Sequence, residues 1–195
     1  IMVQAKPKLR TFEDYLAYAG GANGEADSRY ELTNGELIEI PPESDDNLCR
    51  GMKLYEALKA LVGMRQIRLQ GLALAMPGQP KNRYPDLAVL RPEHPDQMRD
   101  LGQAAITLEM APPLLVVEVV SPGAENHRRD YIDKRNQYEW RGIPEYWIVD
   151  PVLGQVTVLF LTEQGYEETV FRGEQAVKSP SFTDWTLTAI DMLAV

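Results

Sequence analysis

Two acidic residues of this chain lie within or beside short apolar runs. Asp86 follows Pro85 and precedes the apolar stretch 87–90, and Glu118 lies inside the run of leucines and valines at 114–120. Both runs are typical of strands that are buried on both faces of a sheet. An unpaired carboxylate is costly to bury, so two of them on separate strands indicate a shared cation.

A second group of polar residues follows Glu118 along the chain. Asp130, Lys134 and Tyr138 recur every four residues in a segment that we predict to be helical from about 128 to 140. At this spacing they share one helix face. A lysine on that face could orient a water nucleophile or balance charge that develops on phosphorus. Glu31, in a predicted hairpin, is a candidate fourth member of the site.

Metal-assisted hydrolysis of phosphodiester bonds is the chemistry that these residues permit. Mg²⁺ is a hard ion that is usually bound by one or two carboxylates together with waters and phosphate oxygens. Asp86, Glu118 and the backbone carbonyl of Val119 fit that requirement. The metal would polarise the phosphate and lower the pKa of a bound water.

Each candidate also has a structural interpretation. Asp86 could cap a turn after Pro85, and Glu118 could form an ion pair with Lys134 or Arg129 without any catalytic role. Three arginines compete with Lys134 as the catalytic cation: Arg128, Arg129 and Arg135. Tyr138 could be a packing residue, and Glu31 could be an ordinary exposed glutamate of a strand.

The composition limits the class of protein. With 195 residues, 44% of them hydrophobic and 25% charged, the chain fits a single soluble domain over residues 1–195, with a flexible segment at 1–10. No apolar run approaches the about 20 residues that span a bilayer, so no membrane partner is expected. Because there is one cysteine and no signal-peptide core, we expect a cytoplasmic protein without an intramolecular disulfide.

The net charge of −9 argues against a non-specific DNA binder. Affinity for nucleic acid depends largely on Lys and Arg that neutralise phosphates. Basic clusters nevertheless flank both carboxylate strands, at 81–83 and at 127–129. They fit a phosphate-binding patch and an ordinary solvated surface equally well.

The order of apolar segments predicts an α/β protein with a mixed sheet. A strand, a helix and a strand between Leu114 and Val149 predict a right-handed parallel crossover. Asn34-Gly35 predicts a type I′ turn in a hairpin over 30–40. Further strands are predicted at 66–75, 84–90, 156–161 and 167–171.

Helices are predicted after Thr11 and after Asp45 or Asp46, and a polar loop at 91–103. The apolar face predicted for the second helix is Leu48, Met52, Tyr55, Leu58, Leu61 and Val62. The predicted surface histidines are His94 and His127, and the predicted core aromatics are Trp140, Tyr146 and Trp147.

Four motifs follow one another between about Thr11 and Leu161. They are Tyr30-Glu31-Leu32 with Gly35-Glu36-Leu37, Tyr84-Pro85-Asp86-Leu87-Ala88-Val89, Leu115-Val116-Val117-Glu118-Val119-Val120-Ser121-Pro122, and Gly142-Ile143-Pro144-Glu145-Tyr146-Trp147-Ile148-Val149-Asp150-Pro151. In order and spacing they resemble the Uma-two family of endonucleases, within the PD-(D/E)xK restriction-endonuclease-like superfamily. The resemblance implies a restriction-endonuclease-like mixed β-sheet flanked by helices, with an added N-terminal helix and hairpin.

The resemblance also implies a cofactor, partners and site residues. The cofactor would be Mg²⁺, with Mn²⁺ as a substitute, and the substrate would be nucleic acid, DNA or RNA, with a homodimer as one form of assembly. Carried over position by position, Asp86 and Glu118 are metal ligands, and Glu31 matches the upstream glutamate of the family.

One position departs from the wider superfamily, which has a lysine two residues after the glutamate. That position is Val120 here, so the resemblance implies a lysine that has migrated to the following helix. Lys134 fits this role, with Tyr138 beside it. The chain also has Ser44-Asp45-Asp46-Asn47 where the family often has a histidine near the start of the long helix.

Two functions are consistent with these observations. The first is a divalent-metal-dependent nuclease that hydrolyses phosphodiester bonds. The second is a catalytically inactive nuclease-fold module that binds nucleic acid or protein as a dimer. The net charge of −9 and the altered segment 44–47 favour the second, and the converging carboxylates favour the first.

Overall fold

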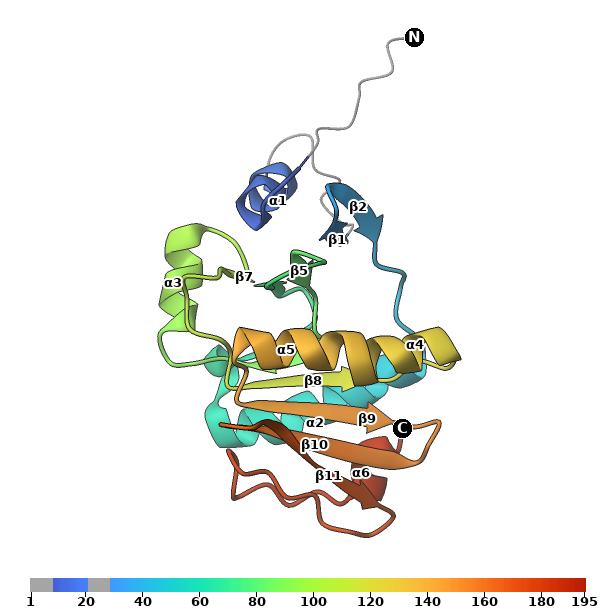
Figure 1. Cartoon of the computed structure of the whole chain (residues 1–195). Coiled ribbons are helices and arrows are strands. Elements are labelled where there is room, and N and C mark those ends of the chain that lie inside the picture. Colours follow the sequence, from blue (N-terminus) through green and yellow to red (C-terminus); the bar gives the residue numbers. More distant parts are fainter. Residues whose placement is uncertain (1–8, 21–28) are drawn as a thin grey trace.

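The computed structural model describes residues 9–20 and 29–195 (Figure 1). Most of the predicted flexible segment 1–10 lies outside these ranges. A six-stranded mixed sheet forms the centre of the fold, in the order β11-β10-β9-β8-β6-β3. Its strands are β3 (Ile67–Leu69), β6 (Leu87–Val89), β8 (Leu115–Val119), β9 (Glu145–Asp150), β10 (Gln155–Thr162) and β11 (Gly165–Arg172). The pair β8 and β9 is parallel and the other pairs are antiparallel, which confirms the predicted α/β fold with a mixed sheet.

Helices cover both faces of this sheet (Figure 1). On one face lie α2 (Asp45–Val62) and α6 (Ala189–Leu193). On the other lies a continuous helix made of α4 (Ala124–Arg128), the π-helical segment η2 (Arg129–Lys134) and α5 (Arg135–Arg141). Across the described residues, no helix combines the length and apolarity that a membrane span requires.

The alternation of side chains along β8 decides where its carboxylate points. Successive residues of a strand face opposite sides of the sheet. Val117 and Val119 pack with the residues of α2 and α6, whereas Val116 and Val120 pack with Tyr138 of α5. Glu118 therefore faces the α4–α5 helix, with valines two residues before and after it on the same face.

A smaller lobe stands beside the large sheet (Figure 1). It contains α1 (Phe12–Ala19), β1 (Tyr30–Thr33), β2 (Glu36–Glu39), β4 (Ala73–Ala75), β5 (Asn82–Arg83), α3 (His94–Leu101) and β7 (Ala105–Ile106). The predicted turn is confirmed, since Asn34 and Gly35 have φ of 52° and 84° between β1 and β2. Asn82 joins β1 to β5, because its side chain accepts from the amide of Leu32 at 2.9 Å and donates to the carbonyl of Tyr30 at 2.8 Å.

Two predictions about helix starts have different outcomes. Thr11 caps α1 in a capping box with Asp14, as predicted. The second helix is capped by Ser44 rather than by Asp45 or Asp46, since the Ser44 hydroxyl accepts from the amide of Asn47 at 3.3 Å.

The buried face of α2 agrees with the predicted one in part, since Leu58 is buried and Tyr55 and Val62 pack against the core, whereas Leu61 is 39% exposed. Its buried residues are Asn47, Gly51, Leu54 and Leu58, whereas Met52 is 50% exposed. A side chain at Gly51 would come within 3.1 Å of Leu69, so the missing side chain lets the helix lie close on β3. This close approach fixes which face of α2 is turned inward.

The segments 66–75 and 91–103 also differ from prediction. In the first segment, Gln70 and Gly71 have positive φ and separate β3 from β4, which belongs to the smaller lobe. A 3₁₀ turn, η1 (Met64–Gln66), precedes β3. The predicted loop 91–103 contains α3, with a proline in its first turn.

Two side chains, one in α3 and one in α5, have the opposite burial to the one predicted. His94 is fully buried, because its ring accepts from the Arg91 amide at 3.1 Å and lies 2.9 Å from the Ala111 carbonyl oxygen. Burial also lowers its pKa. Trp140, predicted in the core, is 70% exposed, whereas Tyr146 and Trp147 are buried and His127 is exposed, as predicted.

A buried carboxylate in β9 generates a stability prediction. Glu145 accepts from the indole N–H of Trp147 at 2.5 Å and from the amide of Ser181 at 2.9 Å. We expect Glu145→Ala to lower the free energy of unfolding by about 1–3 kcal/mol, because it leaves the buried indole N–H of Trp147 without its acceptor and removes the acceptor of the Ser181 amide. Urea denaturation measures this. Glu167→Ala, an exposed glutamate of β11, is the control, and an equal effect of both substitutions would contradict the prediction.

Candidate active site

Glu118 is held at both of its carboxylate oxygens. The Tyr138 hydroxyl donates to Oε1 at 2.5 Å, and Lys134 Nζ lies 2.7 Å from Oε2. All three side chains are buried, and burial raises the pKa of Glu118 even though Lys134 opposes the shift. The structure thus brings together three of the predicted site residues.

Asp86 lies just before β6, next to the end of β8. Its Oδ2 accepts from the amide of Val119 at 2.8 Å, which joins it to the residue after Glu118. Burial, reinforced by repulsion from the Glu118 carboxylate, raises the pKa of Asp86 to about 8, and Lys134 offsets part of this. The two carboxylates predicted as metal ligands therefore share one site.

Asp130 is a third carboxylate at this site, and the sequence analysis gave it no role. Its Oδ1 lies 2.9 Å from Lys134 Nζ and 3.3 Å from Arg129 Nε. Its Oδ2 is buried and has no hydrogen-bond partner in the described part of the chain. The Tyr146 hydroxyl fixes the local backbone by donating to the carbonyl of Asp130 at 3.0 Å. The sequence signal was the four-residue spacing between Asp130 and Lys134.

Lys134 alone among the four predicted cations contacts Glu118. Burial opposes its charge, but the carboxylates of Glu118, Asp130 and Asp86 outweigh burial and raise its pKa. By contrast, Arg128 pairs with Asp133 and is largely exposed, while Arg135 donates to the carbonyl of Tyr166. The competing arginines are thereby assigned to other contacts.

A cleft of about 560 Å³ opens over this cluster. Its charged lining residues are Glu31, Glu39, Glu43, Asp86, Glu118, Glu125, Arg129 and Lys134. The carboxylates outnumber the cations, so a further cation would be stabilised there. This excess, together with the raised pKa values of Asp86 and Glu118, fits a divalent metal ion.

The donors suit a hard divalent metal ion. Nowhere in 9–20 or 29–195 do three or more His, Cys, Asp or Glu side chains converge as a complete protein cage for a metal. Two carboxylates, with the remaining positions left to water and substrate, are the arrangement that Mg²⁺ uses most often. Val119 lines the same cleft, so its carbonyl oxygen stays a candidate ligand.

The start of α2 contributes residues that the sequence analysis missed. The Asn47 amide donates to Glu43 Oε1 at 2.9 Å, lies 3.2 Å from Ser121 Oγ, and reaches the Val119 carbonyl at 3.5 Å. The segment that departs from the family pattern thus lies at the cleft. Its only signal in the sequence was that departure.

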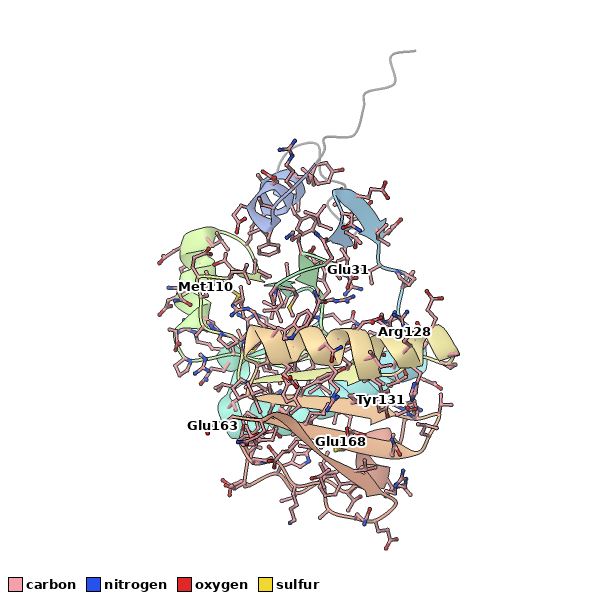
Figure 2. The ribbon with its side chains drawn as sticks, viewed as in Figure 1. Glu31, Met110, Arg128, Tyr131, Glu163 and Glu168 are labelled. Carbon is pink, nitrogen blue, oxygen red and sulfur yellow. The ribbon has the colours of Figure 1, made fainter. Side chains whose placement is uncertain are left out.

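Glu31 lines the cleft from the smaller lobe (Figure 2). Its Oε2 lies 2.8 Å from Arg83, whose Nε donates to Gln137 Oε1 at 2.8 Å. The pair therefore ties the hairpin to α5. A catalytic role for Glu31 stays a prediction.

Comparison with known proteins adds a family and a fold. The family model Uma2, described as "Putative restriction endonuclease", matches residues 12–190. No curated relative matches the chain. The crystal structure of a "putative nuclease belonging to DUF820" from Anabaena variabilis superimposes with a TM-score of 0.61 at 17% identity. The match covers 84% of this chain and 89% of that one, and at this identity it shows a shared fold.

The raised pKa of Asp86 predicts how stability depends on pH. Between its ordinary value of 3.8 and about 8, the folded chain holds a proton that the unfolded chain has released. Asp86 thus makes the free energy of unfolding fall as pH rises through this range. We expect the stability of Asp86→Asn relative to the wild type to be clearly larger at pH 8 than at pH 5.

Urea denaturation at both pH values tests this prediction. Asp184→Asn, at an exposed aspartate, is the matched control and should track the wild type at both. Millimolar Mn²⁺ at pH 8 should stabilise the wild type and not Asp86→Asn. A stability difference that is the same at pH 5 and pH 8 would show that the Asp86 carboxylate titrates normally.

The triad of Glu118, Lys134 and Asp130 predicts a large effect of removing its cation. Lys134→Met leaves two carboxylates buried together, and breaking a buried ion pair costs about 3–5 kcal/mol. Thermal and urea unfolding at pH 7 measure the loss. Lys178→Met, at an exposed lysine, should change stability by less than about 0.5 kcal/mol. A Lys134→Met protein as stable as this control would rule out the buried triad.

Proposed function

The chain belongs to the Uma2 family, and we propose that it is a divalent-metal-dependent nuclease that hydrolyses phosphodiester bonds in DNA or RNA. The observation that carries the proposal is the convergence of Asp86 and Glu118, both with raised pKa values, beside a buried lysine in an acidic cleft. Such perturbed groups cluster at functional sites.

Mg²⁺ is the proposed cofactor, and Mn²⁺ would substitute for it. Asp86, Glu118 and the carbonyl of Val119 would hold the ion. When bound, it would polarise a phosphate oxygen and lower the pKa of a water. Asp86 Oδ1 makes no hydrogen bond with the described part of the chain, and both Glu118 oxygens keep a free lone pair beside the contacts to Tyr138 and Lys134.

Lys134 is the proposed catalytic cation. An ammonium group has three N–H donors, of which Glu118 and Asp130 occupy two. The third is available for a water or a phosphate oxygen in the cleft, which Lys134 lines. Because the surrounding carboxylates keep the lysine charged, it would stabilise negative charge that develops on the phosphate.

Tyr138 and Asp130 act through other residues. The Tyr138 hydroxyl fixes one oxygen of Glu118, and the pKa of this tyrosine is raised by burial and by Glu118, so it stays a donor. Asp130 forms a second ion pair with Lys134, at 2.9 Å. Both are therefore proposed as positioning residues.

Cleavage and metal binding test the proposed function together. With Mg²⁺ or Mn²⁺ the wild type should cut one or more of single-stranded DNA, duplex DNA and RNA. Asp86→Asn should reduce the rate roughly 100-fold or more, because metal ions contribute several kcal/mol to such transition states and about 1.4 kcal/mol is a factor of ten. In calorimetric titration, saturable Mn²⁺ binding should disappear in the same variant.

Asp184→Asn is again the control and should keep wild-type binding and rate. If the wild type cuts none of these substrates with either ion, the inactive nuclease-fold module becomes the better interpretation. If Asp86→Asn cuts as fast as the wild type, the activity does not come from this site.

A further inference from the structure

A second cavity, of about 260 Å³, lies beside the catalytic cleft. It is lined by Val120, Ser121, Gly123, Ala124, His127, Asp150, Val152 and Leu153. These residues belong to the segments that follow β8 and β9, which are parallel and end at the same edge of the sheet. The carboxyl ends of parallel strands are where ligands bind in open α/β sheets.

The cavity and the catalytic cleft share one wall. Ser121 lines both, and each of the residues 122–127 lines one or the other. Pro122 and Glu125 line the cleft, while Gly123 and Ala124 line the cavity. A molecule with one group in the cleft would therefore extend its neighbouring group into the cavity.

The lining favours a flat and uncharged group. Val152 and Leu153 form the rim and are 60% and 52% exposed. Among the described residues that line the cavity there is no lysine or arginine, so it lacks the side-chain cations on which phosphate binding largely depends. The carboxylate of Asp150 is already bound, since one oxygen accepts from the amides of Val152 and Leu153, at 2.9 Å each, and the other accepts from the Tyr131 hydroxyl.

His127 provides an aromatic surface whose orientation is fixed. Its ring stacks on that of Tyr131, with centroids 4.2 Å apart and planes 16° apart. Tyr131 is held in turn, because its hydroxyl donates to Asp150 at 3.1 Å and accepts from Gln155 at 3.2 Å. A ring that packed on His127 would extend this stack.

We propose that this cavity binds one unpaired nucleobase of the nucleic acid whose phosphodiester occupies the cleft. The proposal rests on the proposed nuclease function and narrows its substrate. A base paired and stacked in a duplex cannot enter, so the substrate is single-stranded or has a base turned out of its helix. The volume lies below the about 300–1,000 Å³ of pockets for drug-sized ligands, which suits a single ring system.

The charge of the chain fits the same substrate. A net charge of −9 disfavours binding that depends on many phosphate contacts. Stacking of bases on aromatic side chains does not itself need positive charge, and in proteins that bind single strands it contributes beside the phosphate contacts. Recognition by a base cavity would compensate for the shortage of cations.

Fluorescence anisotropy with a labelled twelve-nucleotide single strand tests the proposal. All proteins carry Asp86→Asn, so that cleavage does not interfere. Two further ligands serve for comparison: the duplex form of the same strand, and a single strand that contains abasic sites. Adding His127→Ala should weaken single-strand binding roughly 5- to 150-fold, as expected for one lost stack. His127→Phe, which keeps a flat ring, should restore it.

Leu153→Glu should weaken single-strand binding as well, whereas Leu108→Glu, at an exposed leucine of the loop after β7, should not. The abasic strand and the duplex should bind more weakly and respond little to His127→Ala. Single-strand binding that is absent, or unchanged by His127→Ala and Leu153→Glu, would overturn the proposal. So would a shift from dimer to monomer in these variants with unchanged binding, because the cavity would then hold a side chain of a second copy.

The nuclease function is measured separately, as Mg²⁺-dependent cleavage by chains with Asp86 intact. Cleavage that occurs while single-strand binding is independent of His127 would refute the base cavity and leave the nuclease standing. Single-strand binding that depends on His127, in a chain that cleaves nothing, would support the base cavity and refute the nuclease function.

Discussion

The fold places three carboxylates in one site around one buried lysine, and the arrangement of the site follows from how these charges are satisfied. Glu118, Asp130 and Lys134 form the buried centre, and Asp86 adds a further acidic group that accepts from the Val119 amide but forms no ion pair of its own with the described residues. Because charge in a protein interior must be paired or neutralised, the helix that carries Lys134 has to cross β8 with this face inward. Carboxylates still outnumber cations at the site, which accompanies the raised pKa values of Asp86 and Glu118 and gives the cleft its acidic lining.

The sequence reveals much of this centre because strand alternation and helix spacing are local rules. An apolar run interrupted by Glu118 identifies a buried strand, and its alternation sets the face to which the carboxylate points. The four-residue spacing then places Lys134 and Tyr138 on one face of the next helix. The same rules predict the parallel crossover and the turn at Asn34-Gly35, both of which the structure confirms.

Other features depend on contacts between distant segments, which local rules do not contain. Asn47 reaches the end of β8 only because α2 lies close on the sheet at Gly51. His94 is polar and lies in a polar stretch, yet two backbone partners make its burial acceptable. Trp140 is large and apolar, yet it lies on the outer side of its helix. In each case tertiary packing overrides the preference of the residue type.

The π-helical turn from Arg129 to Lys134 affects how the sequences of homologues align with this chain. Such a turn amounts to an α-helix with one residue inserted, and it is found frequently at functional sites. Deleting that residue would rotate α4 by about 100° relative to α5, and would turn Glu125 of α4 away from its present place at the cleft. A homologue with a purely α-helical segment here would need a one-residue gap in its alignment, and a different set of its α4 residues would face the cleft.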